Sequence, residues 1–385
     1  MIFFLSHPVQ YVSPLLRELA SRVQLQVYYY GGKEGAKFDK GFGQEVKWDI
    51  PLLDGYESCF LKNSSRAESM STKFTDAINF NIFKILRKAK SEIVIINGWA
   101  YMSDWFVLIA AKIFGHKVWM RAEMPWNQEI LKPKSIKNRI KYWLFKHIVF
   151  KYLVDRFLYI GSQNKLFYIN HGVPENKLIF APYAVENERF AAQKSSDKIS
   201  YRQHYGIAAN QFVILYSGKL IDKKRPLDLL RAFQLLENNN IVLFFLGDGP
   251  LRGEIETEIQ NSNIKNVIIS GFINQSEIGK IYNMADVFVM CSGIGETWGL
   301  SVNEAMNFGL PVVVSDTCGS AHDLVLDGSN GFKFKEGNIA ELKNQLELLS
   351  NDKSLCIRFG EKSSEKIMDF SHHITVQNIS EVIAS

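Results

Sequence analysis

Residues 287–306 read VFVMCSGIGETWGLSVNEAM, and this stretch decides the fold. Four apolar residues, Val287–Met290, predict a buried strand, a glycine-containing loop follows, and a helix is expected to begin near Gly299. Strand, loop and helix in that order form the repeating unit of parallel α/β sheets. Glu296 then lies in the loop and Glu304 in the second turn of the helix. The unpaired N–H groups at the start of such a helix form an anion-binding site.

The same alternation of short apolar runs and amphipathic segments extends over the whole chain and predicts two doubly wound domains facing a central cleft. Residues 185–208 are polar and weakly patterned, so we expect them to link the two sheets. Residues 31–66 are read as long loops with one strand at most. The predicted strands are residues 2–5, 26–30, 93–97, 117–121 and 156–160, then 212–217, 242–246, 267–270, 287–290 and 312–315. The predicted helices are residues 12–21, 75–88, 103–114, 135–151 and 163–170, then 226–236, 251–260, 276–283 and 300–308.

Length and composition fit this reading. A chain of 385 residues is too long for one ordinary domain and suits two. With 46% hydrophobic and 22% charged residues, extensive disorder is excluded. The four cysteines lie far apart without a CxxC pair, which suits a reducing cytoplasm better than a zinc site or a disulfide framework. The start of the sequence lacks the basic segment and long apolar run of a signal peptide, so we expect a cytoplasmic protein.

One basic segment, between Ile130 and Val154, carries seven Lys and Arg residues and no Asp or Glu, more than the whole net charge of +5. Apolar residues interleave with its cations at helical spacing. This pattern fits a helix that docks peripherally on an anionic membrane surface, and equally a core-packed helix with a solvated basic face. No nucleic-acid-binding module accompanies it, so no nucleic acid partner is expected. The candidate membrane contacts are Lys137, Lys141, Trp143 and Lys151.

Several catalytic signatures are missing from the sequence. No two aspartates are separated by a single residue, so a DxD metal site is absent, and HExxH, GxSxG and P-loop patterns are absent too. Fixed cations and a helix N-terminus can take the place of a metal, so we expect no metal and no cofactor. The GxGxxxG run at residues 247–253 lacks the acidic residue that completes a dinucleotide fingerprint.

Further stretches accompany the two glutamates of residues 296–306 in a fixed order. With them, the sequence resembles the EX7E pattern of retaining GT-B glycosyltransferases of family 4, also called glycosyl transferases group 1. The resemblance covers residues 205–350 strongly and residues 1–180 weakly. The stretches read YSGKLIDKKRPLDLL from Tyr216, GDGP from Gly247, SGFI from Ser270, SDTCG from Ser315 and DGSNGF from Asp327.

This resemblance implies a GT-B fold and transfer of a hexose from a nucleoside diphosphate sugar with retention of configuration. It places Lys219 and Lys224 on the donor diphosphate, where fixed cations stabilise the charge of the leaving group. It places Glu296 near the transferred sugar, where a carboxylate supports the developing oxocarbenium charge. These three are the predicted catalytic residues. The predicted donor-binding residues are Gly218, Gly247, Asp248, Gly249, Phe272, Ile273, Thr297, Trp298, Gly299, Leu300 and Glu304.

The sequence departs from the family pattern in three places. The family more often has Arg at Lys219, whose ammonium lacks bidentate geometry, and it commonly has Gly at Arg225. Many members carry a His where this chain reads Asn97-Gly-Trp-Ala, so the general base stays open. The acceptor-side candidates are His7, Gln10, Arg121 and Glu123. Open alternatives are a structural role for His7, a simple ion pair of Arg121 with Glu123, and a place in the core for Trp298.

The predicted domains are residues 1–185, which bind the acceptor, residues 186–365, which bind the donor, and residues 366–385, a helix crossing back to the first domain. The predicted function is sugar transfer from a nucleotide sugar to a glycan or polyprenyl-linked acceptor, in cell-surface polysaccharide synthesis. Two alternatives stay open: a nucleotide-sugar epimerase or phosphorylase on the same fold, and a non-catalytic protein that binds nucleotide or membrane.

Overall fold

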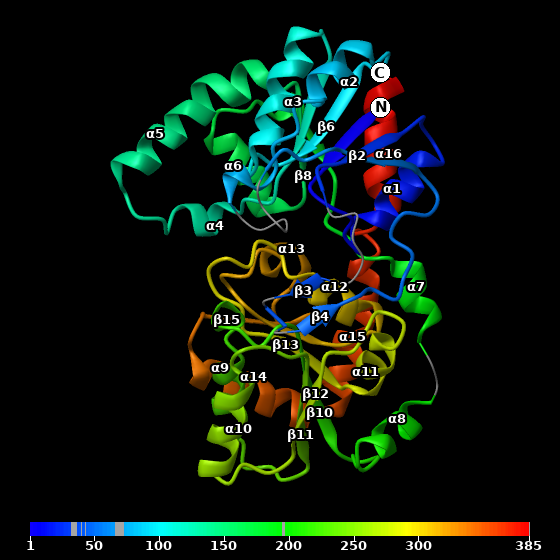
Figure 1. Ribbon diagram of the computed structural model, residues 1–385. Coiled ribbons are helices and arrows are strands. Elements are labelled where there is room, and N and C mark those ends of the chain that lie inside the picture. Colours follow the sequence, from blue (N-terminus) through cyan, green and yellow to red (C-terminus); the bar gives the residue numbers. More distant parts are fainter. Residues whose placement is uncertain (32–36, 40, 43, 66–72, 195–196, 385) are drawn as a thin grey trace. The chain divides into compact units, whose positions relative to one another are not determined.

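The computed structural model describes residues 1–31, 37–39, 41–42, 44–65, 73–194 and 197–384 (Figure 1). The chain forms two compact units. The first comprises Met1–Gly35, Pro51–Tyr183 and His372–Ser385, and the second comprises Ala36–Ile50 and Ala184–Ser371. Each unit contains its own parallel sheet, so the predicted class of two Rossmann-like doubly wound domains is confirmed. Residues 36–50, placed in the first domain by the sequence, group with the second unit.

The first unit is built on a seven-stranded sheet in the order β5-β2-β1-β6-β7-β8-β9, with every pair parallel. Alternate residues of a strand point to opposite faces, and both faces of β1 (Ile2–Leu5) are covered. Phe4 packs with the cluster under α2 and α3, whereas Phe3 packs with α1 and α16. The other strands are β2 Gln26–Tyr29, β5 Glu57–Phe60, β6 Ile93–Asn97, β7 Lys117–Arg121, β8 Arg156–Tyr159 and β9 Leu178–Phe180.

Helices on both faces complete this unit (Figure 1). The last helix, α16, packs against α1 and β9, with Val376 and Ile379 buried among the leucines of α1. The helices are α1 Ser13–Ala20, η1 Phe74–Asp76, α2 Ile82–Lys88, α3 Met102–Ile113, α4 Trp126–Glu129, α5 Ile136–Leu144, η2 Phe145–Leu153, α6 Ser162–Asn170, η3 Glu175–Lys177 and α16 His372–Ala384.

The second unit is built on a six-stranded parallel sheet in the order β12-β11-β10-β13-β14-β15. Its most buried strand, β11 (Ile241–Leu246), has six buried apolar residues in a row, as a strand covered on both faces requires. A short antiparallel hairpin, β3 (Lys37–Asp39) and β4 (Gln44–Val46), also belongs to this unit. The other strands are β10 Phe212–Ser217, β12 Val267–Gly271, β13 Val287–Met290, β14 Val312–Ser315 and β15 Gly331–Phe334.

Residues 185–208 connect the two sheets, as predicted, but they contain two helices, α7 and α8, that belong to the second unit. Arg202 explains why the segment is ordered: its guanidinium donates to the carbonyl of Met284 and pairs with Asp286. The helices are α7 Asn187–Ala192, α8 Lys198–His204, η4 Asp222–Lys224, α9 Pro226–Gln234, α10 Arg252–Asn261, α11 Ile278–Met284, α12 Leu300–Asn307, α13 Ala321–Leu324, α14 Ile339–Asn351 and α15 Lys353–Ile367.

Both sheets reverse their strand order at one point. In chain order, the second sheet runs 3-2-1-4-5-6, and the reversal lies between β10 and β13. The first sheet reverses in the same way between β1 and β6. Loops on either side of such a reversal diverge and leave room for a ligand beyond the carboxyl ends of the strands. These two points are therefore where binding residues are expected in each unit.

Candidate active site

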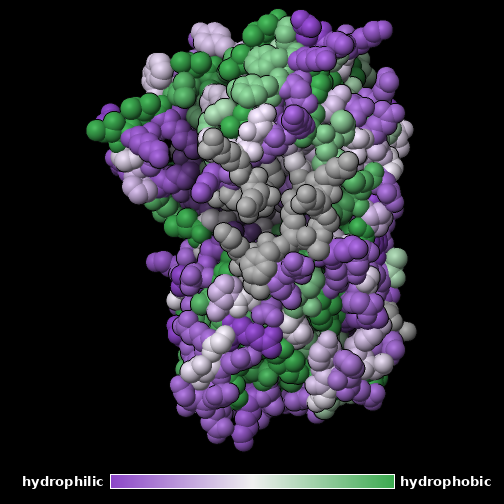
Figure 2. All heavy atoms as spheres, in the orientation of Figure 1, coloured by the Kyte–Doolittle hydropathy of each residue, from purple (hydrophilic) through white to green (hydrophobic). Residues whose placement is uncertain are grey.

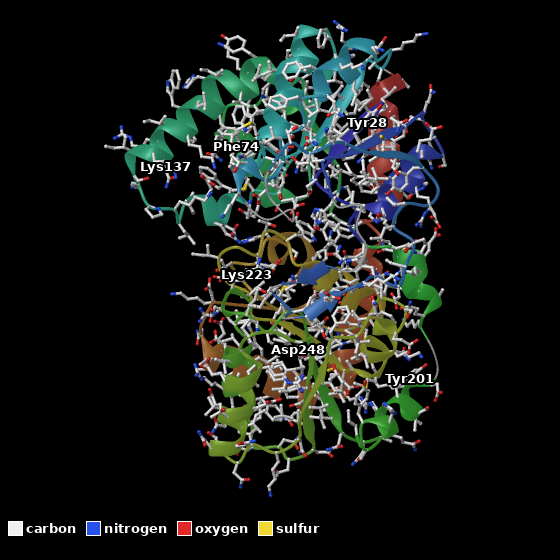
Figure 3. All side chains as sticks on the ribbon, viewed as in Figure 1. Tyr28, Phe74, Lys137, Tyr201, Lys223 and Asp248 are labelled. Carbon is white, nitrogen blue, oxygen red and sulfur yellow. The ribbon has the colours of Figure 1, made fainter. Side chains whose placement is uncertain are left out.

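Two loops meet where β10 and β13 are neighbours in the second sheet. One begins at Gly218, directly after β10, and the other contains Glu296 and follows β13. The backbone N–H of Gly293 donates to the carbonyl of Lys223 over 2.8 Å, which ties the loops together. Figure 3 labels Lys223 in the first loop and Asp248 after the neighbouring strand β11. The residues predicted for the donor thus gather at one edge of this sheet.

Lys224 and Glu296 form an ion pair at this edge. Their side chains are only 15% and 11% exposed, so each charge is partly withdrawn from water and the opposite charge stabilises it. Lys224 ends the short helix η4, and Glu296 is held by a turn in which its N–H donates to the carbonyl of Gly293. Two of the three predicted catalytic residues are therefore in direct contact.

Arg225 stands at a position where the family commonly has glycine. Its backbone is left-handed, with φ of 49°, a conformation in which glycine is favoured. Its guanidinium donates to Asp228 over 2.6 Å and to Glu336 over 3.3 Å. Arg225 therefore serves the geometry of the loop, and Lys224 is the residue of this basic run that pairs with Glu296.

Lys219 forms an ion pair with an aspartate of the same unit. Its ammonium lies 2.7 and 2.8 Å from the two carboxylate oxygens of Asp39, at the end of β3, and 4.8 Å from the ring centroid of Phe42. Burial by itself raises the pKa of Asp39, but Lys219 and the N–H groups of Gly41 and Phe42 lower that pKa overall. The charge of Lys219 is therefore paired with the carboxylate of Asp39. Lys219 itself lies on the same loop as Lys224.

The segment 36–50 also packs against the stretch that contains the predicted donor-binding residues Phe272 and Ile273. Phe272 meets the ring of Phe42 edge-on at 4.9 Å between centroids and that of Trp48 at 6.0 Å. The side chain of Asn274, next to Ile273, donates to the carbonyl of Lys47 over 2.7 Å. This hairpin therefore packs on the SGFI stretch that the sequence assigned to the donor.

The turn after β11 admits only glycine at two positions. Gly247 has φ of 141°, and a Cβ there would overlap the carbonyl of Gly218. A Cβ on Gly249 would stand 2.6 Å from the carbonyl oxygen of Leu220. Between them, the Asp248 carboxylate accepts from the N–H of Gly249 and pairs with Arg252 at 3.0 Å. The β10 and β11 loops thus touch backbone to backbone, which places Asp248 beside the Lys219 loop.

Glu304 sits in a network of buried polar groups on α12. Its carboxylate accepts from the hydroxyl of Tyr282 over 2.6 Å. Burial raises the pKa of Glu304, while Tyr282, Arg189, Gln275 and Lys224 act in the opposite direction. Arg189 in turn donates to the backbone and side-chain oxygens of Gln275. This carboxylate is therefore held in place by side chains of α7 and α11.

Buried side chains hold the loop that leads into α12. Trp298 is only 2% exposed, and its indole N–H donates to Asn303 over 2.8 Å, so its ring occupies the core. Gly299 has φ of 97° and a Cβ there would meet the sulfur of Met290 at 2.5 Å. Thr297 and Leu300 remain partly exposed beside it. The N-terminal amides of α12 are thereby presented by a rigid turn.

The acceptor-side candidates lie in the first unit. Arg121 is buried, and its guanidinium lies 4.6 Å from the ring centroid of Tyr183. Glu123 accepts from the hydroxyl of the same tyrosine over 2.5 Å. His7, which follows β1, is part-exposed and its Nδ1 lies 3.0 Å from the hydroxyl of Ser6. Gln10 is also part-exposed, in the turn before α1.

The basic segment is not core-packed along α5. No residue of α5 is buried, and Ile136, Ile140 and Trp143 are 75%, 61% and 55% exposed. The alternative of a core-packed helix is therefore wrong for α5. It holds for η2, a π-helical continuation in which Phe145 and Phe150 are buried. In Figure 2, exposed apolar side chains lie next to hydrophilic ones over α5, and Figure 3 labels Lys137 on this helix.

Within the described ranges, no three His, Cys, Asp or Glu side chains gather in a group that could hold a metal ion. Metal independence stays a prediction. None of the helices in the described part of the chain is long and apolar enough to cross a bilayer.

Comparison with known proteins finds a family similarity in the second unit. Residues 197–366 match the family model described as Glycosyl transferases group 1. The putative glycosyltransferase EpsD of Bacillus subtilis (strain 168) is 27% identical over 204 residues, 52% of this chain and 52% of EpsD. A second relative, the UDP-Gal:alpha-D-GlcNAc-diphosphoundecaprenol alpha-1,3-galactosyltransferase of Escherichia coli, is 28% identical over 315 residues, 80% of this chain and 78% of that protein.

Solved structures match the whole chain. HepE from Anabaena, in a complex with UDP and glucose, has a TM-score of 0.73 at 18% identity, covering 100% of this chain and 99% of HepE. WaaG, a glycosyltransferase involved in lipopolysaccharide biosynthesis, has a TM-score of 0.69 at 15% identity with the same coverage. The fold is therefore that of the GT-B proteins. Residues 197–366 therefore resemble a glycosyl transferases group 1 domain, and the two relatives named above are glycosyltransferases.

Sequence reasoning missed several residues of this site. Asp39 and Phe42 belong to a polar stretch that was read as loop, and only the folded chain brings them to Lys219. Gln275, in the turn before α11, and Tyr282, on α11, support Glu304. For Gln275 the sequence did hold a signal, because it lies in the polar stretch directly after β12, at the carboxyl end of a parallel strand where ligands bind.

Proposed function

We propose that this chain is a retaining hexosyltransferase that moves a sugar from a nucleoside diphosphate donor to a glycan or polyprenyl-linked acceptor in cell-surface polysaccharide synthesis. The Lys224–Glu296 pair at the strand reversal is the observation that carries the proposal. The pair supports the proposal because a leaving diphosphate is stabilised by a nearby cation and a developing oxocarbenium ion by a nearby carboxylate. The relatives' names supply the substrate classes: UDP-galactose with diphosphoundecaprenol for one, and UDP for HepE.

In the proposed reaction, the bond from the sugar C1 to the diphosphate oxygen breaks, and a bond from C1 to the acceptor oxygen forms on the same face. Lys219, Lys224 and the N-terminal amides of α12 stabilise the charge that accumulates on the departing diphosphate. Glu296 stabilises the positive sugar. Because departure and attack share one face, the departing phosphate oxygen is positioned to take the proton of the acceptor hydroxyl.

A donor screen tests the proposal. UDP-, GDP- and ADP-sugars are added separately to the full chain and the unfolding temperature is measured, because a ligand that binds only the folded state raises it. We expect a UDP-sugar to give the largest rise. The best donor is then incubated with an acceptor extract, and the products are analysed by NMR. A nucleotide sugar that is converted without any acceptor would contradict transfer and identify an epimerase.

Asp39 is expected to compete with the donor diphosphate for Lys219. The pair is about one-third exposed, so its free energy is small, and Asp39→Asn should tighten UDP binding by about three- to fivefold. Isothermal titration with UDP measures the change. The matched control is Asp49→Asn, which removes a carboxylate of the same segment that bonds Ser276 instead. Weaker binding of UDP by Asp39→Asn would contradict competition and make Asp39 part of the donor site.

The exposed helix α5 supports a second part of the proposal, namely that the chain works at the inner face of a membrane as a peripheral protein. Apolar side chains at positions 136, 140 and 143 are exposed on a helix whose segment carries seven cations and no carboxylate. Such a surface is favourable at an anionic leaflet, where each cation adds about 1 kcal/mol of binding free energy.

Charge reversal tests this docking. The variant Lys137→Glu/Lys151→Glu is expected to remain in solution when wild-type protein floats with vesicles of phosphatidylcholine and phosphatidylglycerol. The reason is that two favourable charges become two repulsive ones. The control is Lys84→Glu/Lys88→Glu, which changes the net charge equally on the exposed face of α2. Equal loss of flotation in both variants would show that net charge, rather than the basic segment, holds the protein on vesicles.

A further inference from the structure

A small pocket lies beneath α5 in the first unit, separate from the donor-side residues. Its floor is aromatic: Trp99, Phe145 and Phe167 line it, with the Trp99 ring centroid 4.6 Å from that of Phe145 and 6.3 Å from that of Phe167. Lys132 and Lys141 line its rim together with Glu129. The pocket thus combines an apolar base with a cationic opening.

Its place in the fold is that of a ligand site. Trp99 follows the carboxyl end of β6, and Met124, another lining residue, follows that of β7. Open α/β sheets bind their ligands beyond the carboxyl ends of the strands. The roof is α5, which is tethered to the unit by the Tyr142 hydroxyl donating to the carbonyl of Asn170 over 2.6 Å. The pocket therefore opens at the binding edge of the first sheet and below the helix proposed to meet the membrane.

The charges around the pocket favour an anion. Lys132 pairs with Glu129 at 2.5 Å, which leaves the Lys141 charge in excess. Among the residues that the structure describes, Lys141 has no carboxylate partner, and its ammonium lies 5.8 Å from the ring centroid of Phe145. Burial and the nearby Lys132 lower the pKa of Lys141, Glu129 acts in the opposite direction, and Lys137 lowers it further. An anion in the pocket would relieve this repulsion.

The size of the pocket limits what can enter. Its volume is about 30 Å³, and a single water needs about 10–15 Å³. That is room for a compact group and not for a sugar ring. A phosphate fits the charge and the size, and the aromatic floor suits methylene groups attached to it.

We propose that this pocket binds the phosphate group of an amphipathic acceptor, with Lys141 and Lys132 holding the phosphate and the aromatic floor contacting the first carbons of its lipid chain. This inference rests on the proposed acceptor class and names the part of the acceptor that the first unit recognises. A phosphate of this kind is carried by a prenyl phosphate or by a membrane phospholipid. The position at the carboxyl ends of β6 and β7 favours the acceptor as the source.

Isothermal titration of the full chain with geranyl phosphate, geraniol and inorganic phosphate tests the pocket. We expect saturable binding of geranyl phosphate and much weaker binding of the other two, since each lacks one half of the recognised group. Lys141→Ala or Lys132→Ala should weaken geranyl phosphate binding about tenfold or more, as expected for loss of a charge-assisted hydrogen bond. Lys134→Ala, an exposed lysine of the same segment that does not line the pocket, should stay within about twofold.

Other results would overturn the proposal. If geraniol bound as tightly as geranyl phosphate, the pocket would recognise only the apolar chain. If Lys134→Ala and Lys141→Ala lost the same affinity for geranyl phosphate, the overall positive charge of the segment, and not the pocket, would bind the phosphate. Phosphatidylglycerol vesicles that block geranyl phosphate binding would make membrane lipid the source. Lys141→Arg keeps the charge and should retain binding, which separates recognition from misfolding. None of these measurements uses sugar transfer, so their failure leaves the donor-side proposal to its own tests.

Discussion

Replacing Lys224 by methionine is expected to lower the rate of sugar transfer by about 10²–10³-fold, the loss that follows removal of one fixed charge from a transition state. Lys224 and Glu296 are each mostly covered by protein, so water screens their charges only weakly. The corresponding Glu296→Gln variant should lose activity to a similar extent. Steady-state kinetics with the best donor and acceptor of the screen measures both, with the loss appearing in kcat.

The ion pair also predicts how stability responds. Each single variant leaves one mostly covered charge without the opposite charge of the pair, whereas Lys224→Met/Glu296→Gln removes both. The double variant should therefore unfold in denaturant closer to wild type than the sum of the single effects, while remaining inactive. Activity and stability are thereby separated, because a protein that folds well yet does not transfer sugar has lost chemistry.

Lys223 offers the matched control for this prediction. It is the neighbouring lysine, and its ammonium donates to the carbonyl of Gly295 over 3.2 Å at the surface. Lys223→Met should keep transfer within about twofold of wild type, since exposed contacts of this kind contribute little. Unimpaired transfer by Lys219→Met/Lys224→Met would overturn the assignment of both lysines to the diphosphate.

Much of the fold could be predicted from apolar runs. Strands β1, β6, β7, β10, β13 and β14 have the predicted bounds, because each has a core of at least three consecutive buried residues. The short strands β9 and β15 were missed, since three or four residues such as Leu178–Phe180 carry too little pattern to separate from loop. The hairpin of β3 and β4 was missed because its residues are polar and gain order from contacts with a distant part of the chain.

The helix α5 shows what periodicity cannot decide. The helical spacing of Ile140, Trp143, Leu144 and Ile148 predicts an amphipathic helix, but it does not say what covers the apolar face. Only the folded chain shows that this face is exposed. The same limit applies to the site: residues 219, 224 and 296 could be assigned from motifs, whereas the Asp39 contact depends on how the chain folds back on itself.

Replacing Gly247 by alanine is expected to destabilise the second unit by about 3 kcal/mol or more. The substitution adds a Cβ that overlaps the carbonyl of Gly218 and it forces a side chain into a φ of 141°. Overpacking and a strained backbone each cost about 1–3 kcal/mol. For a unit of this size, that is a fall of roughly 6–12 °C in the unfolding temperature, measured by calorimetry.

Gly253 is the control in the same stretch of sequence, near the start of α10. A Cβ at Gly253 meets nothing within 4 Å, and its φ is not in the left-handed region. Gly253→Ala should therefore leave stability unchanged or raise it by about 0.5 kcal/mol, because alanine restricts the unfolded chain and favours helix.

The two variants together test the contact that positions the donor loops. Because Gly247 rests on Gly218, the residue before Lys219, displacement of one loop should move the other, and Gly247→Ala should also weaken UDP binding. Unfolding at the wild-type temperature, with UDP bound as in wild type, would show that the β10 and β11 loops are not in close contact in solution. Lys219 would then be positioned by Asp39 and the hairpin instead, and Asp39→Asn would be expected to weaken rather than tighten donor binding.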